Sequence, residues 1–183
     1  MAAIRPDQAK TGAITGTPET QATPRPGRYE IDTSYSTVTF KTRHLFGLAP
    51  VRGSFAIRTG TADVAEPLAG SNVSAQIDPA SFSTGNAQRD NYVRSERLLD
   101  AGRYPVITFC SEGVDGLAVA GTLTVRNVTM PVSLSIERSA VTQRSFNVHA
   151  STHIDRNEFG VTAYRGMAGR YLDITVEARC VRT

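Results

Sequence analysis

Apolar and polar residues alternate with a period of two in eight stretches of the chain. In the last stretch, every second residue from Leu172 to Cys180 is apolar and the residues between them are polar. Successive strand side chains point to opposite faces, so each stretch has one face toward an apolar interior and one face toward solvent. Eight such strands can close around a space that holds side chains or one small ligand. The pattern therefore predicts an all-β fold, an eight-stranded antiparallel up-and-down barrel.

Short turns separate most of the predicted strands, which favours antiparallel pairing between neighbours in sequence. A sandwich of seven or eight strands has the same alternation and is the alternative architecture. Gly53 falls on the inward face of the second strand, where a missing side chain lets a barrel bend or a guest fit. The strands are expected near residues 37–41, 51–59, 72–78, 106–111, 117–125, 132–136, 146–154 and 172–180.

The period changes in the longest interruption, residues 82–105. Tyr92, Leu98 and Leu99 have the spacing of a short helix of two or three turns, which ends before Pro105. This helix lies between the third and fourth predicted strands. A helix inserted into an all-β chain can close one mouth of a barrel or cover a sheet edge.

Composition is typical of one globular domain. Residues 1–27 are rich in Thr, Ala, Gly and Pro without apolar periodicity, so we expect a flexible N-terminal tail before a domain at 28–183. The net charge of +3 is spread along the chain, and no basic run indicates a nucleic-acid partner. No apolar run reaches the roughly 20 residues of a membrane span. Residues 1–27 also lack the apolar core of a secretory signal, so we expect a cytoplasmic protein.

Two cysteines and two histidines are candidates for chemical sites. Cys110 and Cys180 fall in predicted strands, where we interpret them as small buried hydrophobic residues; a disulfide stays open because sequence does not give their separation. His149 and His153 lie on the predicted outer face, about 13 Å apart by strand rise, too far to share one metal ion. The sequence predicts no metal site and no cofactor.

Five phrases occur in order from about Arg28 to the C-terminus: IDTSYSTVTFKTRHL, VRGSF, RDNYVRSERLLDAGRYPVITF, VAGTLTVRNVTMPVSL and IDRNEFG. Together they resemble the YceI-like family. The resemblance implies an elongated, lipocalin-like barrel of eight antiparallel strands whose apolar tunnel holds a long isoprenoid chain. Tyr35 and Tyr92 depart from the family pattern, which commonly has histidine there, and the identity of the lipid stays open.

Inward-facing apolar residues are the predicted tunnel wall. A lipid would bind there by burying CH₂ groups, each contributing about 0.8 kcal/mol. The same residues could instead interdigitate and fill the barrel, and periodicity does not separate these cases; the family resemblance favours the tunnel. The predicted tunnel residues are Val38, Phe40, Phe55, Ile57, Phe109, Leu123, Leu134, Phe146, Val148, Leu172 and Ile174.

Polar residues near the predicted mouth are candidates for contact with a lipid head group. His44 ends the first strand and is either a head-group ligand or a histidine bonded to a backbone carbonyl. Arg89 and Asp90 open the predicted helix, where Asp90 can cap it and Arg89 can pair with Asp90 or Asp155. The candidates are His44, Arg89, Asp90, Arg94 and Arg165.

Three functions fit these observations. The first is a protein that binds, and carries or stores, a long isoprenoid such as a polyprenyl phosphate or a quinone. The second is an interaction protein linked to stress, with a packed interior. The third and least favoured is an isoprenoid-modifying enzyme, since the sequence offers no nucleophile–histidine–acid set or paired carboxylates, and we predict no catalytic residue. A homodimer is compatible with each function.

Overall fold

The computed structural model describes residues 23–44, 48–165 and 167–183. Most of the predicted tail lies outside these residues. The helical elements are α1 (Ala87–Arg94) and the 3₁₀ helices η1 (Thr33–Tyr35) and η2 (Leu68–Gly70). The strands are β1 (Gly27–Ile31), β2 (Thr37–His44), β3 (Ala49–Val64), β4 (Asn72–Ser83), β5 (Ile107–Asp115), β6 (Ala118–Val125), β7 (Val128–Val141), β8 (Ser145–Asp155) and β9 (Tyr171–Arg182).

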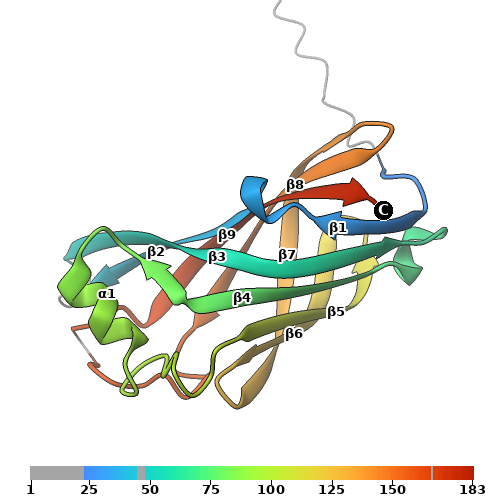
Figure 1. The fold of residues 1–183 in the computed structure, drawn as a ribbon. Helices are drawn as coiled ribbons and strands as arrows, with labels where there is room; N and C mark the ends of the chain where they lie inside the picture. Colours follow the sequence, from blue (N-terminus) through green and yellow to red (C-terminus); the bar gives the residue numbers. More distant parts are fainter. Residues whose placement is uncertain (1–22, 45–47, 166) are drawn as a thin grey trace, which may run out of the picture.

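The nine strands occupy eight positions of a closed antiparallel barrel (Figure 1). Each strand from β2 to β9 pairs with the next, and β9 returns to β2 with Val176 opposite Val38. The short β1 pairs with β3 and β9 beyond the point where β2 begins, so β1 and β2 are two halves of one position interrupted by η1. This confirms the predicted eight-stranded barrel, and the closure rules out the open sandwich.

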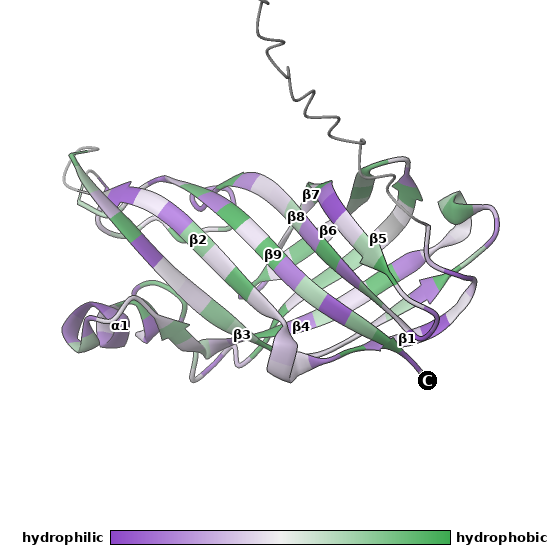
Figure 2. Ribbon diagram, turned by 90° about the horizontal axis from the view of Figure 1, so that it is seen from above, coloured by the Kyte–Doolittle hydropathy of each residue, from purple (hydrophilic) through white to green (hydrophobic). Residues whose placement is uncertain are grey.

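The predicted inward and outward faces are those of the structure. Figure 2 shows apolar and polar residues alternating along β2, β3 and β9. β3 has 16 residues, about 50 Å at the usual strand rise, so the barrel is elongated. None of the helices in the described ranges is long and apolar enough to cross a bilayer.

The two ends of the barrel carry different elements. The helix end carries α1, the β2–β3 hairpin and the segment between β8 and β9; the η2 end carries η2, the β7–β8 hairpin and the C-terminus (Figure 1). At the helix end, Phe40 stacks on Phe82 with ring centroids 5.3 Å apart. At the η2 end, the Tyr29 ring packs edge-on against Phe146 at 4.9 Å. Aromatic residues therefore anchor a packed cluster at each end.

A large irregularity in β4 brings Phe82 into the helix-end cluster. Ser54 pairs with Ser83 and Ala56 with Asp78, so five steps along β4 correspond to two along β3. The extra residues include the fully buried Pro79, which has no N–H to leave unpaired. This bulge ends the regular pairing of β4 and directs the chain toward α1.

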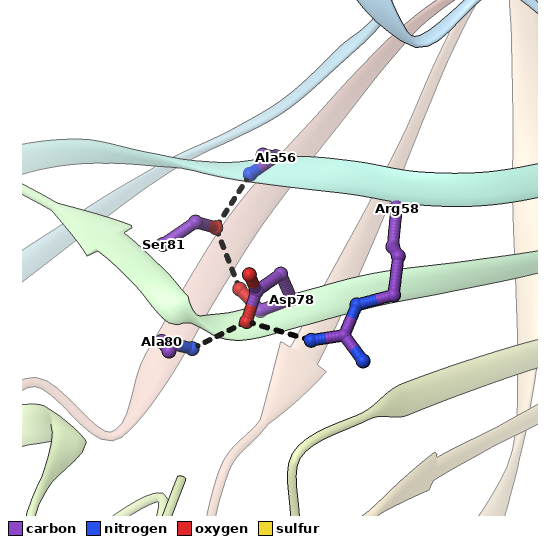
Figure 3. Close-up of polar contacts among 5 residues, drawn as sticks. All are labelled: Ala56, Arg58, Asp78, Ala80 and Ser81. Atoms are coloured by element: carbon purple, nitrogen blue, oxygen red, sulfur yellow. Dashed lines mark hydrogen bonds and ion pairs between the residues drawn. The ribbon is translucent and has the colours of Figure 1, made fainter.

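Side chains hold this bulge from the outer surface (Figure 3). The Ser81 hydroxyl accepts a hydrogen bond from the Ala56 N–H at 2.7 Å and donates one to the Asp78 carbonyl at 2.6 Å. The Asp78 carboxylate accepts from the Ala80 N–H at 2.9 Å and lies 3.5 Å from the Arg58 guanidinium. These contacts supply hydrogen bonds to backbone N–H and carbonyl groups that have lost their strand partners at the bulge.

The predicted helix is present and has two turns, but it ends before two of the apolar residues that indicated it. It ends at Arg94, and Leu98 and Leu99 lie in the turns that follow, where both are buried. Asn86 caps it, since its side-chain oxygen accepts from the Arg89 N–H at 3.0 Å. The expectation that Asp90 caps the helix was therefore wrong. Apolar spacing marked the buried residues correctly but did not separate a helix from a series of turns.

Charged groups hold the segment between β8 and β9. Asp155 pairs with Arg170 at 2.7 Å and accepts the Asn157 N–H at 2.9 Å. Arg156 is buried and donates to the carbonyls of residues 161, 168 and 169. The sequence left open a pairing of Arg89 with Asp90 or with Asp155; among the described residues Arg89 forms an ion pair with neither, and Asp155 pairs with Arg170. Burial alone would raise the pKa of Asp155, but the hydrogen bonds from Asn157 and Arg170 hold it below its ordinary value.

Acid should weaken this anchor. Because the pKa of Asp155 is lower in the folded protein, its contribution to stability is complete above the ordinary value of 3.8 and is lost as pH falls through the folded value. We expect Asp155→Asn to lower the free energy of unfolding at neutral pH. The difference in free energy of unfolding between this variant and the unmodified protein should become smaller in strong acid. Urea titrations across the pH range would measure this, with the exposed Glu96→Gln as control; a difference independent of pH would contradict it.

Packing around Gly53 makes a second prediction. A Cβ atom there would lie 2.4 Å from the Ser83 carbonyl oxygen and 2.6 Å from the Phe40 ring, so neighbouring protein atoms fill this space. Gly53→Ala should destabilise the barrel by about 1–3 kcal/mol through overpacking. Gly102→Ala, with nothing within 4 Å of its Cβ, is the control. Equal denaturation midpoints for the two variants would contradict the prediction.

Candidate functional site

The barrel encloses an apolar cavity of about 860 Å³. Residues from every strand, α1, η2 and the segment between β8 and β9 line it. Its volume falls within the roughly 300–1,000 Å³ of small-molecule sites. Whether its wall contacts a ligand stays a prediction. All eleven predicted tunnel residues lie in this wall: Val38, Phe40, Phe55, Ile57, Phe109, Leu123, Leu134, Phe146, Val148, Leu172 and Ile174.

The inner face of β7 shows how much of the interior is left open. Val132, Leu134 and Ile136 point inward but are only half-buried, while the intervening Ser133 and Ser135 are exposed outside. Protein interiors are close-packed, so inward residues of a filled barrel would be buried. The half-buried side chains therefore border unfilled space, and the barrel is hollow along this wall.

Polar groups border the cavity mainly near its two ends. Thr42, Gln88 and Arg89 contribute at the helix end, and Asp63 and Asn72 at the η2 end. Leu, Val, Ile and Phe side chains make up most of the wall between them. The cavity therefore suits a long apolar ligand with a polar group near one end.

Arg89 is the predicted head-group residue that the structure places in the cavity wall. Its guanidinium also donates to the Thr84 hydroxyl at 2.7 Å, which orients the side chain. Asp90 is buried beside it and accepts hydrogen bonds from the Thr84 N–H and hydroxyl. Burial alone would raise the pKa of Asp90, but these hydrogen bonds and the nearby Arg94 hold it below its ordinary value. Asp90 does not line the cavity.

The other head-group candidates lie elsewhere. Arg94 donates from Nε and Nη2 to the Phe82 carbonyl at 3.1 and 2.5 Å and is not part of the cavity wall. Arg165 is exposed to solvent and also absent from the wall. The His44 side chain lies outside the described part of the structure. Of the four candidates with described side chains, the structure brings Arg89 alone to the cavity.

A tyrosine pair at the helix end escaped the sequence interpretation. The hydroxyl groups of Tyr92 on α1 and Tyr164 are hydrogen-bonded, and Arg97 donates to Tyr164 at 3.2 Å. Hydrogen bonds from Tyr92 and Arg97 lower the pKa of Tyr164. Both tyrosines line the cavity and join α1 to the segment before β9. No local signal marks this pair, since 72 residues separate its members.

The two cysteines are free and have different surroundings. Cys180 is buried and lines the cavity, and burial raises the pKa of its thiol to about 12. Such a thiol is protonated and inert at neutral pH. Cys110 is exposed, with its sulfur 3.9 Å from the Ser74 hydroxyl, so the expectation that it is buried was wrong.

The outer-face histidines pair with carboxylates. His149 Nδ1 lies 3.0 Å from Glu137, and His153 Nδ1 lies 2.7 Å from Asp173. Within the described ranges, no group of three or more histidine, cysteine or acidic residues could hold a metal ion.

Comparisons of sequence give one family. A sequence profile for the YceI-like domain matches residues 29–180. A UPF0312 protein of Vibrio campbellii is 34% identical over 117 residues, which cover 60% of this chain and 61% of that protein. The UPF0312 protein YE1254 of Yersinia enterocolitica is 29% identical over 167 residues, covering 84% of this chain and 86% of that protein. The match therefore spans less than two thirds of the Vibrio relative.

Solved structures share the fold. BcnA of Burkholderia cenocepacia superposes with a TM-score of 0.70 at 20% identity, covering 81% of this chain and 98% of that one. A polyisoprenoid binding domain from Saccharophagus degradans gives a TM-score of 0.66 at 17% identity, covering 85% and 98%. At these identities the likeness concerns the fold alone. Because the family profile spans nearly the whole barrel, this chain belongs to the YceI-like domain family.

Proposed function

We propose that this barrel binds a long isoprenoid lipid in its cavity and carries or stores it. The observation that carries the proposal is the apolar space of about 860 Å³ bordered by inward side chains that stay half-buried. A cavity of this kind lacks partner atoms for its lining, so a ligand that fills it gains dispersion contacts and removes its own surface from water.

The chemistry of the wall favours a long hydrocarbon. Each CH₂ group buried contributes about 0.8 kcal/mol, so a chain of many carbons needs few polar contacts to bind. Part of this energy offsets the lost freedom of a flexible lipid. The polyisoprenoid binding domain of Saccharophagus degradans, which has the same fold, supports an isoprenoid over other long chains.

The polar head of the lipid would lie at the helix end. Arg89 borders the cavity there, and its hydrogen bond to Thr84 already fixes the position of its guanidinium. The guanidinium can therefore donate to a phosphate or quinone oxygen with little further loss of side-chain freedom. Gln88 and Thr42 offer further polar groups nearby. Arg94, Asp90 and Arg165 would then stabilise or surround this mouth without contacting the lipid.

Native mass spectrometry of the purified full chain, followed by solvent extraction, tests the proposal. We expect an added mass that organic solvent releases and that belongs to a series spaced by whole isoprene units. The protein should also take up a polyprenyl phosphate or a quinone after the lipid is removed. A bare protein mass that does not change after incubation with either lipid would overturn the proposal.

Leu134→Trp tests whether the interior is hollow. In a filled barrel the larger side chain would cost about 1–3 kcal/mol by overpacking. In this cavity it should be accommodated with little change in stability. Displacing about two CH₂ groups of a bound lipid, at about 0.8 kcal/mol each, should weaken retention about tenfold.

Ser133→Trp, on the outer face of the same strand, is the matched control. We expect it to leave lipid retention unchanged. Urea denaturation measures the stability of both variants, and a lipid competition assay measures retention. Strong destabilisation by Leu134→Trp, or equal retention in the two variants, would contradict the hollow interior.

A further inference from the structure

We propose that the helix end of the barrel docks on the surface of an anionic lipid bilayer. The proposal goes beyond binding of a lipid inside the cavity, and docking and binding can fail independently. It rests on exposed apolar side chains, on the distribution of charge and on the placement of tyrosines.

Exposed apolar side chains extend from two loops at the helix end. Leu48 in the β2–β3 hairpin is 82% exposed, and Met167 before β9 is 58% exposed. Gly169, two residues after Met167, packs against Thr42 and Arg43 at the end of β2, which places Met167 near the same end of the barrel as Leu48. Water-exposed side chains of this size gain free energy when they enter the interfacial region of a bilayer.

Charge is distributed unequally along the barrel. The helix-end segments (41–44, 48–52, 84–105, 126, 155–165 and 167–173) contain eleven basic and six acidic residues. The η2-end segments (23–32, 61–73, 111–118, 137–146 and 177–183) contain six basic and eight acidic residues. One end is therefore net positive and the other net negative. This polarity would orient the barrel with its helix end toward an anionic surface.

Two exposed basic residues face each other near the helix end. Lys41 and Arg52 lie directly opposite each other on β2 and β3, and like charges in this position repel. Asp173 lies opposite Lys41 on β9 and offsets part of this repulsion, although neither Lys41 nor Arg52 takes part in an ion pair among the described residues. An anionic surface would interact favourably with both cations.

Tyrosines gather at the same end. Of the six in the chain, the helix end holds four: Tyr92, Tyr104, Tyr164 and Tyr171. Tyrosine is enriched at membrane interfaces, because its ring is apolar and its hydroxyl group is polar. Tyr92 is both 46% exposed and part of the cavity wall, as is the exposed Met167. The cavity therefore reaches the surface where the docking groups lie, and docking would bring its mouth against the acyl chains of a bilayer.

Vesicle co-sedimentation of the full chain tests docking. We expect binding to phosphatidylcholine vesicles that contain phosphatidylglycerol and weak binding to pure phosphatidylcholine, with the difference reduced by salt. Arg165→Gln should weaken partitioning about fivefold, the usual effect of one cation near an anionic surface. Leu48→Ser should weaken it about tenfold by removing a buried leucine side chain from the bilayer.

Matched variants at the η2 end serve as controls. Arg144→Gln removes an exposed arginine and Leu117→Ser an exposed leucine at the opposite end of the barrel, and neither should change partitioning. Circular dichroism would verify that all four variants fold. Lipid content by native mass spectrometry separates this test from that of the proposed function, since docking can be lost while the lipid stays bound.

Three outcomes would overturn the proposal. The first is equal binding to both vesicle types, and the second is equal loss of binding in the helix-end and η2-end variants. The third is no vesicle binding together with a dimer that Leu48→Ser converts to a monomer in analytical ultracentrifugation, since a second copy of the chain would then cover this end.

Discussion

Closure of the sheet is the constraint on which the rest of this structure depends. β9 pairs with β2 along one half of its length and with β1 along the other, so η1 interrupts the first strand position without opening an edge. Closure removes the two free edges that an open sheet would have, although β4 leaves regular pairing with β5 beyond Ile77. It also makes register strict, because a slip of one residue would turn each apolar face toward water.

The interior follows from where large side chains lie within this closed wall. Phe40, Phe55 and Phe82 pack together at the helix end, and Tyr29 packs on Phe146 at the η2 end. Between them, β7 presents medium-sized apolar side chains that stay half-buried and border the cavity. Packing at the ends thus stabilises the fold, while the space between them stays open. A ligand that binds only the folded state would add stability there.

Arginine has two uses at the helix end. Arg94 and Arg156 donate to backbone carbonyl groups and so hold α1 and the segment before β9 in place. Arg165 is exposed and contributes to the excess positive charge at this end. The same residue type therefore orders the loops around the cavity mouth and sets the electrostatic character of its rim.

The chain's period-two alternation determined the eight long strands and their inward faces, including the eleven apolar residues that border the cavity, because alternation is a local property that a closed sheet preserves. It did not indicate the short strand β1. The tertiary structure decided the rest. It encloses an apolar cavity, and it pairs Asp155 with Arg170, whereas the sequence had left Arg89 to pair with Asp90 or Asp155. Tyr92 met Tyr164 across 72 residues. The local pattern of residues indicates which way a side chain faces. Which side chains contact each other depends on the path of the whole chain, so only the closed fold determines those contacts.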